Sequence, residues 1–167
     1  KINVQLKPVT PVIKANQTKF CLGDTIKFAV EEVEGVTYEW TGPNNYSAST
    51  PAITIPVTDF NVAGVYTVLL KIGECVSDPT QITIPAIAKV PIAAFTTDPL
   101  FNSKFTTPLP ITFKNNSKDA DSYLWEFGDG STSDEINPTH TYFRSGTFKV
   151  KLTAFADEGC SNSIVIG

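Results

Sequence analysis

Residues 123–130 read YLWEFGDG, and this stretch decides the fold of the second half of the chain. Aromatic side chains recur at every second position of its first part, which is typical of a β-strand with one buried face. Trp125 stands in the middle of that strand, where a thin sandwich core needs a large aromatic side chain. The segment Gly128-Asp129-Gly130 then predicts a tight turn, because glycine adopts a positive φ without steric cost.

Four short motifs of the first half return in the second half in the same order. YEW at 38–40 returns as YLW at 123–125, and Phe28 and Cys75 each have a counterpart 85 residues later. GVYTV at 64–68 returns as GTFKV at 146–150. Repetition at a nearly constant spacing indicates two copies of one architecture.

The composition favours strands over helices in both copies. Thr, Val and Ile together account for 49 of the 167 residues, whereas Leu accounts for 8 and Met for none. β-branched side chains fit a pleated sheet and lose rotamer freedom in a helix. Gly and Pro are spread along the chain as turn signals, so the sequence predicts an all-β protein made of two sandwiches.

Charge and hydropathy exclude two classes of partner. The 17 acidic and 13 basic residues leave a net charge of −4, which provides no positive field for nucleic acid or for an anionic membrane. No run of about 18 apolar residues occurs. We therefore expect neither nucleic-acid binding nor membrane insertion.

Prolines mark the expected domain boundary. Residues 86–91 read AIAKVP, and since proline cannot donate to a β-ladder, a short and stiff linker is predicted there. The expected domains are residues 12–85 and residues 92–167. Residues 1–11 hold two further prolines and are predicted to be a linker or the tail of a preceding domain. The chain starts without Met and stops inside a predicted strand, so we interpret it as a piece of a larger protein.

Three blocks of the second half carry a family resemblance. They are WEFGDG at 125–130, NPTHTY at 137–142 and GTFKVKL at 146–152, in this order. Together they resemble the signature of the PKD family, so residues 92–167 are interpreted as a PKD-like domain. The resemblance implies a seven-stranded sandwich of extracellular proteins without catalytic activity of its own.

The first half is similar to bacterial immunoglobulin-like domains. VAGVYTV at 62–68 resembles their tyrosine corner, with Tyr66 as the tyrosine. An antibody domain has a cysteine two residues after that tyrosine, whereas this chain has Val68, so packing on Trp40 has to replace the missing disulfide. The predicted fold class is therefore all-β, with two tandem immunoglobulin-like β-sandwich domains, an Ig-like one followed by a PKD one.

The pairing of these modules is similar to that in large surface and secreted proteins of Bacteroidetes-type bacteria. The resemblance implies an exported, extracellular or cell-surface location and a non-catalytic spacer or interaction module of an adhesin or a gliding-related protein. The implied partners are other domains of the same protein, surface glycans and other proteins.

Two alternatives for the function stay open. One is a pair of carbohydrate-binding accessory domains in a secreted polysaccharide- or protein-degrading enzyme, and the other is a component of the secretion or gliding machinery. The first alternative needs exposed aromatic side chains, for which the candidates are Tyr46, Phe60, Phe101 and Phe143.

No residue pattern predicts catalysis. His140 is the single histidine and no nucleophile motif accompanies it, so structural hydrogen bonding is its expected role. Glu39 and Glu126 flank tryptophans in separate predicted domains, which does not predict a paired-carboxylate site. The residues predicted to be structural are Trp40, Tyr66, Trp125, Phe127, Tyr142 and Phe148 in the two cores, with Gly128, Asp129 and Gly130 in the turn.

Loop residues offer one candidate metal site, and no other cofactor is expected. Asn116, Asp119 and Asp121 could supply oxygen ligands for Ca²⁺, and the resemblance implies calcium near this loop in some PKD domains. The spacing of an EF-hand is absent and Lys118 interrupts the group, so solvated loop charge is the alternative. Asp129 is expected to bond the backbone amides of its own turn.

Three cysteines leave the disulfide state open. Cys21 and Cys75 could close a long loop in the first domain, which would stabilise it by a few kcal/mol. The predicted strands beside them run in the same direction, however, which would place the two at opposite ends and beyond the Cα limit of about 7 Å. The second half holds one cysteine, Cys160. With these spacings and a single histidine, the sequence does not predict a structural zinc site.

Overall fold

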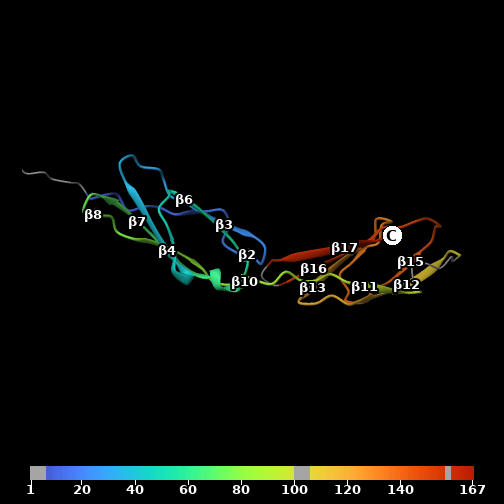
Figure 1. Cartoon of the computed structure of the whole chain (residues 1–167). Coiled ribbons are helices and arrows are strands. Elements are labelled where there is room, and N and C mark those ends of the chain that lie inside the picture. Colours follow the sequence, from blue (N-terminus) through green and yellow to red (C-terminus); the bar gives the residue numbers. More distant parts are fainter. Residues whose placement is uncertain (1–6, 100–105, 157–158) are drawn as a thin grey trace, which may run out of the picture. The chain divides into compact units, whose positions relative to one another are not determined.

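The computed structural model describes residues 7–99, 106–156 and 159–167, and the chain divides into two compact units between Ala88 and Lys89 (Figure 1). The division falls inside the predicted linker, residues 86–91. Each unit is built from β-strands around its own apolar core. The predicted fold class, two tandem immunoglobulin-like β-sandwiches, is confirmed.

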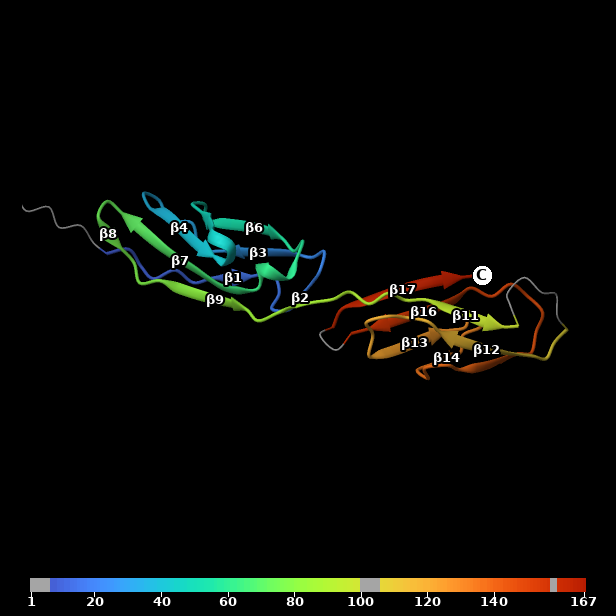
Figure 2. The ribbon, with the colours of Figure 1, turned by 60° about the horizontal axis from the view of Figure 1, so that its bottom comes forward.

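The first sandwich is built from short strands on both sides of one core. Its elements are β1 (Lys14–Ala15), β2 (Phe20–Cys21), β3 (Thr25–Ala29), β4 (Thr37–Gly42), η1 (Pro43–Asn45), β5 (Tyr46–Ala48), β6 (Ala52–Pro56), η2 (Phe60–Val62), β7 (Gly64–Ile72), β8 (Cys75–Val76), β9 (Thr80–Ile84) and β10 (Ile87–Ala88). One sheet has the order β1-β3-β6, and the other has the order β5-β4-β7-β8 with β9 also paired to β7 (Figure 2). A short parallel pair joins β10 to β2.

Alternation along the strands decides which faces are buried. In β4, Tyr38 and Trp40 lie in the core, while Glu39 between them is exposed. In β7, Tyr66 and Val68 are buried in the same way. A half-buried antiparallel sheet requires this period of two, since successive side chains point to opposite faces.

The second sandwich has two sheets with seven strands in its described residues. They are β11 (Phe95–Asp98), β12 (Leu109–Asn115), β13 (Ser122–Glu126), β14 (Thr132–Ser133), β15 (Thr139–Tyr142), β16 (Val150–Phe155) and β17 (Ser161–Ile166). The sheet orders are β11-β12-β15 and β14-β13-β16-β17. Aromatic rings fill the space between the sheets: Phe95 and Phe113 lie 5.1 Å and 5.4 Å from Trp125, centroid to centroid.

Each sandwich is anchored by one fully buried tryptophan. Trp40 Nε1 donates a hydrogen bond of 2.9 Å to the carbonyl oxygen of Thr50, and Trp125 Nε1 donates one of 2.9 Å to the carbonyl oxygen of Glu135. In both cases the acceptor lies ten residues after the tryptophan. An unpaired buried indole N–H would be costly, so the same solution in both halves supports the internal repeat of the sequence.

The start of the described chain packs on the first sandwich. Lys7 Nζ lies 2.7 Å from Asp78 Oδ1, and the Thr80 hydroxyl donates to the carbonyl oxygen of Pro11. Pro11 is buried. Residues 7–11, which were expected to form a linker or the tail of a preceding domain, thus contact the first sandwich, and residues 1–6 lie outside the described residues.

The disulfide considered between Cys21 and Cys75 does not fit this fold. Cys75 pairs with Ile72 at the carboxyl end of β7, whereas Cys21 lies beside Ala88, just beyond the strand that pairs with the amino end of β7. The nine residues of β7 span about 30 Å at roughly 3.3 Å each. The register therefore places the two cysteines far beyond the Cα separation of about 7 Å that a disulfide allows.

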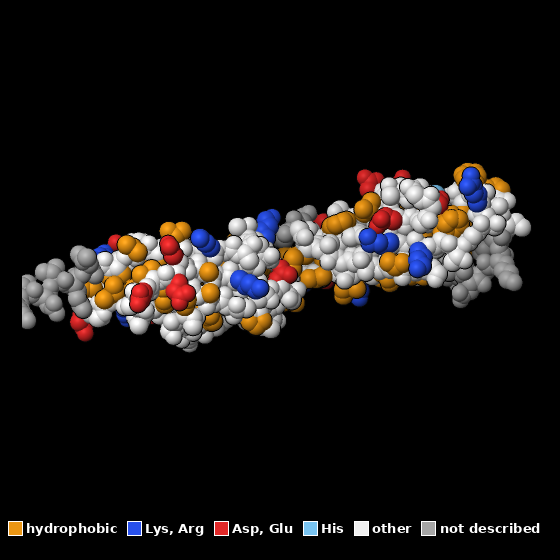
Figure 3. Space-filling model, turned by 90° about the horizontal axis from the view of Figure 1, so that it is seen from above, with side chains coloured by type: hydrophobic (Ala, Val, Ile, Leu, Met, Phe, Trp, Pro, Cys, Tyr) orange, Lys and Arg blue, Asp and Glu red, His pale blue; other side chains and the backbone are white. Residues whose placement is uncertain are grey.

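Charged side chains are dispersed over the surface. On the face shown in Figure 3, Lys and Arg side chains are interspersed with acidic and hydrophobic ones on both units. No helix in the described part of the chain has the length and apolar character needed to cross a membrane.

Candidate functional site

The turn after β13 holds a carboxylate in a fixed position. Gly128 has φ +83° and Gly130 has φ +97°, conformations that favour glycine. A Cβ atom on Gly128 would stand 2.6 Å from the carbonyl oxygen of Lys149, so this position needs glycine for space as well. The turn thereby fixes Asp129 between the two glycines.

Asp129 forms a hydrogen-bonded cluster with Ser131 and His140, which we call the Asp129 clamp. Asp129 Oδ2 lies 2.7 Å from His140 Nε2. Asp129 Oδ1 accepts a hydrogen bond of 3.0 Å from the Ser131 backbone N–H and a second one from the Ser131 hydroxyl. The first of these is the hydrogen bond to a backbone amide that the sequence predicts within the turn. The His140 contact joins the turn to β15 in the other sheet.

Aromatic rings hold His140 in place. Its imidazole stacks on Phe127 at a centroid distance of 4.3 Å and an interplanar angle of 7°, and it meets the edge of Tyr142 at 4.6 Å. The Tyr142 hydroxyl donates a hydrogen bond of 2.8 Å to the carbonyl oxygen of Phe127. On the other side of Tyr142, the partly buried Phe148 stacks at 4.3 Å. The histidine is therefore part of a packed structural unit, with 17% of its side chain exposed.

The clamp sets the ionisation of two groups. Burial acts to raise the pKa of Asp129, but the hydrogen bonds from Ser131 and His140 and the charge of His140 lower this pKa to about 2. Burial raises the pKa of Tyr142 to about 12, and the Asp129 charge adds to the effect. Asp129 is thus a carboxylate near neutral pH and cannot act there as a general acid.

The clamp contains the residue types of a hydrolase triad but lacks its geometry. In a Ser-His-Asp triad, the serine and the carboxylate contact opposite nitrogens of the imidazole. Here Ser131 Oγ at 3.3 Å and Asp129 Oδ2 at 2.7 Å both approach Nε2 of His140. His140 therefore cannot accept a proton from Ser131 on one nitrogen while Asp129 orients the other.

The calcium candidates lie in the loop between β12 and β13 and contact protein groups. Asn116 donates its side-chain amide to Thr96 Oγ1 at 3.2 Å, and Asp119 Oδ1 lies 4.0 Å from Lys89 Nζ. In the described part of the chain, no group of three or more His, Cys, Asp or Glu side chains gathers in a metal-binding arrangement. Calcium binding by Asn116, Asp119 and Asp121 stays a prediction.

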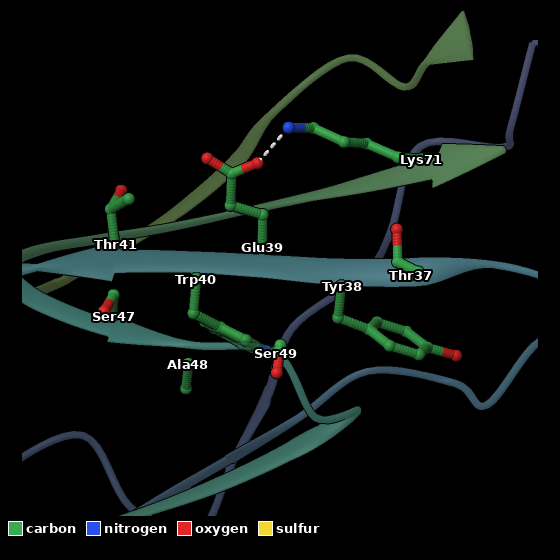
Figure 4. A pocket seen from close by; sticks show the side chains of 9 residues that line it. All are labelled: Thr37, Tyr38, Glu39, Trp40, Thr41, Ser47, Ala48, Ser49 and Lys71. Atoms are coloured by element: carbon green, nitrogen blue, oxygen red, sulfur yellow. Dashed lines mark ion pairs between the residues drawn. The ribbon is translucent and has the colours of Figure 1, made fainter. Parts of the chain in front are cut away.

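The first sandwich carries a polar hollow on its β4–β5–β7 sheet, which we call the polar notch. Its polar lining consists of Thr37, Glu39, Thr41, Ser47, Ser49 and Lys71. Figure 4 shows Glu39 and Thr41 on the side of β4 opposite to Tyr38 and Trp40. The outward-facing residues of these strands therefore supply the polar lining of the notch, and Tyr38, Trp40 and Ala48 complete the lining.

An ion pair joins Glu39 of β4 to Lys71 of the neighbouring strand β7, and both side chains line the notch (Figure 4). Their side chains are 48% and 41% exposed, and exposed ion pairs of this kind contribute at most about 1 kcal/mol to stability. Both charges can therefore be redirected to a ligand at little cost. In the sequence, Glu39 stands out only as a carboxylate beside a tryptophan, because the hollow depends on where β5 ends and no local motif encodes that position.

The second sandwich can be placed among known proteins. The family model of the PKD domain matches residues 88–166. The second sandwich is a PKD domain. Its fold, its turn and its histidine cluster thus agree with the resemblance that the three sequence blocks carry.

Known proteins with PKD domains are similar to part of this chain. "Collagenase ColQ1" of Bacillus cereus is 54% identical over 54 residues, which are 29% of this chain and 6% of the collagenase. "Pre-pro-metalloprotease PrtV" of Vibrio cholerae is 42% identical over 59 residues, which are 33% of this chain and 6% of the protease. The crystal structure of the PKD1 domain of PrtV covers 46% of this chain and 91% of that domain, with 33% identity and a TM-score of 0.38. The chain thus spans a small part of the length of its curated relatives.

The candidate sugar-stacking aromatics are distributed over both units. Phe143 belongs to the PKD domain and is 78% exposed, and Phe60 belongs to the first sandwich and is 46% exposed. Tyr46 is half-buried against Tyr66, with ring centroids 5.8 Å apart. Phe101 lies outside the described residues. Among the candidates that the structure describes, Phe60 and Phe143 are the ones exposed enough for sugar stacking, each within its own unit.

Proposed function

We propose that this chain is a non-catalytic accessory segment of an exported protein-degrading enzyme. The observation that carries the proposal is the identity of 54% and 42% with stretches of a collagenase and a metalloprotease. Both relatives are named as enzymes that degrade proteins. Their names favour an accessory segment of a protein-degrading enzyme over one of a polysaccharide-degrading enzyme. Fold likeness alone would not support a function.

The chemistry of the described residues supports a binding or positioning role. The Asp129 clamp uses its serine, histidine and carboxylate to fix a turn, and its geometry does not permit nucleophilic attack. Glu39 and Glu126 each pair with a lysine on their own sandwich, Lys71 and Lys151. These groups are used for structure or remain available for weak binding.

An accessory segment of this kind would act by tethering. A folded module that holds a polymeric substrate converts its encounter with the attached catalytic domain into an intramolecular event, which raises the effective concentration of substrate. The gain is large for insoluble or fibrous protein and absent for a short soluble peptide. This difference separates tethering from a direct catalytic role.

The test is removal of residues 1–167 from the full-length parent. We expect hydrolysis of insoluble protein to fall about tenfold or more, in the range of a lost tethering effect, while kcat/KM for a short soluble peptide stays within about twofold. An equal loss on both substrates would contradict the proposal, as would a parent reading frame without a peptidase domain.

An adhesin or gliding-related surface protein of a Bacteroidetes-type bacterium is the competing function, and a component of the secretion or gliding machinery is its variant. The pairing of an Ig-like module with a PKD module favours it. It predicts a parent made of many such repeats, and it predicts that a strain lacking these residues attaches or glides less while its extracellular proteolysis is unchanged.

A further inference from the structure

The polar notch lies where one strand of the first sandwich ends early. β4 pairs with β7 from Thr37 to Thr41, but it pairs with β5 only from Trp40 to Gly42. Beyond Ala48 the chain leaves the ladder at Ser49. Residues 37–39 of β4 therefore have no strand partner on that side in the described ladders, and the notch opens beside them.

An unpaired strand segment is a template for another strand. The main chain of an edge strand presents N–H and C=O groups that an extended peptide can pair with, and this mode of recognition draws affinity from main-chain hydrogen bonds. The unpaired residues 37–39 directly precede the residues of β4 that pair with β5. A segment added beside them would therefore extend the existing β4–β5 ladder.

The side chains around the gap suit a polypeptide better than a sugar. Glu39 and Lys71 offer one charge of each sign, and Thr37 and Ser49 add exposed hydroxyls that both donate and accept. A polysaccharide would need an exposed aromatic side chain to stack on. The aromatic residues that line the notch, Tyr38 and Trp40, are 7% and 0% exposed.

We propose that the polar notch binds an extended segment of an unfolded polypeptide, which adds to residues 37–39 of β4 as a short strand in line with β5. Glu39 and Lys71 then separate from each other and contact charged side chains of the bound segment. The inference rests on the proposed function, since it names unfolded protein as the class of substrate that the accessory segment would hold. The site lies on the first sandwich, outside the PKD domain.

The experiment measures binding of residues 1–167 to three probes: unfolded casein, folded serum albumin and dextran. Strand addition requires an extended main chain, so casein is expected to bind and the other two are not. Ser49→Trp fills the notch with an exposed side chain, and Glu39→Lys places two positive charges side by side. Each is expected to raise the Kd for casein about tenfold, which corresponds to the loss of one good polar contact.

The PKD domain supplies matched controls. Glu126 and Lys151 form an ion pair of 2.8 Å on its outer face, with side chains 45% and 42% exposed, so Glu126→Lys makes the same chemical change outside the notch. Ser163→Trp places the same indole on the exposed face of β17. Both controls should bind casein like the parent chain, and thermal unfolding of all four variants verifies that they are folded.

The outcomes separate this inference from the proposed function. Casein binding that is equal in the notch variants and the controls would overturn the site, whatever the deletion in the parent enzyme shows. Notch-dependent binding of albumin or dextran would overturn strand addition by an unfolded chain. If casein binds at the notch but the deletion leaves hydrolysis of insoluble protein unchanged, the site stands and the accessory function fails.

Discussion

The two sandwiches share a tryptophan anchor but fix their loops by different chemistry. In the first sandwich, the Tyr66 hydroxyl donates a hydrogen bond of 2.8 Å to the carbonyl oxygen of Val62, four residues earlier, which forms a tyrosine corner. In the PKD domain, Phe148 occupies the equivalent place in the repeat and carries no hydroxyl. There the Asp129 clamp makes a charged contact between segments eleven residues apart, beside the neutral bond from Tyr142 to the carbonyl oxygen of Phe127. One architecture thus tolerates either a neutral local bond or a charged longer-range one.

The shared part of the comparison predicts the largest effect. Trp40→Ala and Trp125→Ala each remove a fully buried indole and its bond to a backbone carbonyl. Each should lower the free energy of unfolding of its own sandwich by about 3–5 kcal/mol. Guanidinium unfolding measures this, since the tryptophan that remains reports on the other sandwich by fluorescence and circular dichroism reports on both.

The exposed Val165 provides the control for this experiment, since Val165→Ala should change stability by less than about 0.5 kcal/mol. If replacing either tryptophan lowers the free energy of unfolding by less than about 1 kcal/mol, that sandwich does not depend on its tryptophan, and the two sandwiches do not share an anchor.

The turn of the clamp predicts the next effect. Gly128→Ala should destabilise the PKD domain by about 3 kcal/mol, because a Cβ there meets the Lys149 carbonyl oxygen at 2.6 Å in addition to the strain of a positive φ. Gly130→Ala is the matched control, since Gly130 has a similar φ but open space around its Cβ position, and about 1 kcal/mol is expected. Equal losses in thermal or chemical unfolding would show that backbone strain alone matters.

Periodicity and repetition predicted the elements that obey local rules. The alternating stretches around Trp40 and Trp125 predicted buried strands, because a pleated strand has a period of two whatever its partner is. The turn at Gly128 and Gly130 could also be predicted, because few residues other than glycine adopt a positive φ. Prolines predicted a boundary at residues 86–91, and the chain divides into its two units between Ala88 and Lys89.

The features that depend on pairing partners were not visible in the sequence. The role of Ser131 in the clamp requires the register of β12 with β15, which brings His140 to the turn. The polar notch exists because β5 ends at Ala48 while β4 continues, which is a property of two ladders together. The Cys21–Cys75 pair remained open for the same reason, until the register of β7 placed the two at opposite ends.

The charged contact of the PKD domain predicts a pH dependence. The pKa of Asp129 is lowered from 3.8 to about 2 in the folded chain, so the folded state favours the carboxylate. The resulting stability is present above about pH 4 and is lost as the pH falls through about 2. The side chain is 27% exposed, and a contribution of about 2 kcal/mol at neutral pH is expected.

Asp129→Asn tests this sign. The variant should lose about 2 kcal/mol at pH 7 and less as the pH approaches 2, where the parent chain has lost the same contribution. Unfolding followed through Trp125 in a Trp40→Phe background isolates the PKD domain. A difference between parent and variant that is the same at pH 7 and near pH 2 would show that the charge of Asp129 plays no part in the clamp.

The neutral hydrogen bond from Tyr66 to Val62 in the first sandwich predicts the smallest effect on stability. Tyr66→Phe removes the hydroxyl of the tyrosine corner and leaves the ring, so a loss of about 1 kcal/mol is expected. Burial and the neighbouring Tyr46 raise the pKa of Tyr66 above 10.0, so the hydroxyl stays protonated across the acidic and neutral range. The cost of Tyr66→Phe, followed through Trp40 in a Trp125→Phe background, should therefore be constant between pH 3 and 7, within about 0.3 kcal/mol. A cost that changed with pH in this window would mean that a titrating group takes part in the corner, and the contrast between a neutral and a charged solution would no longer hold.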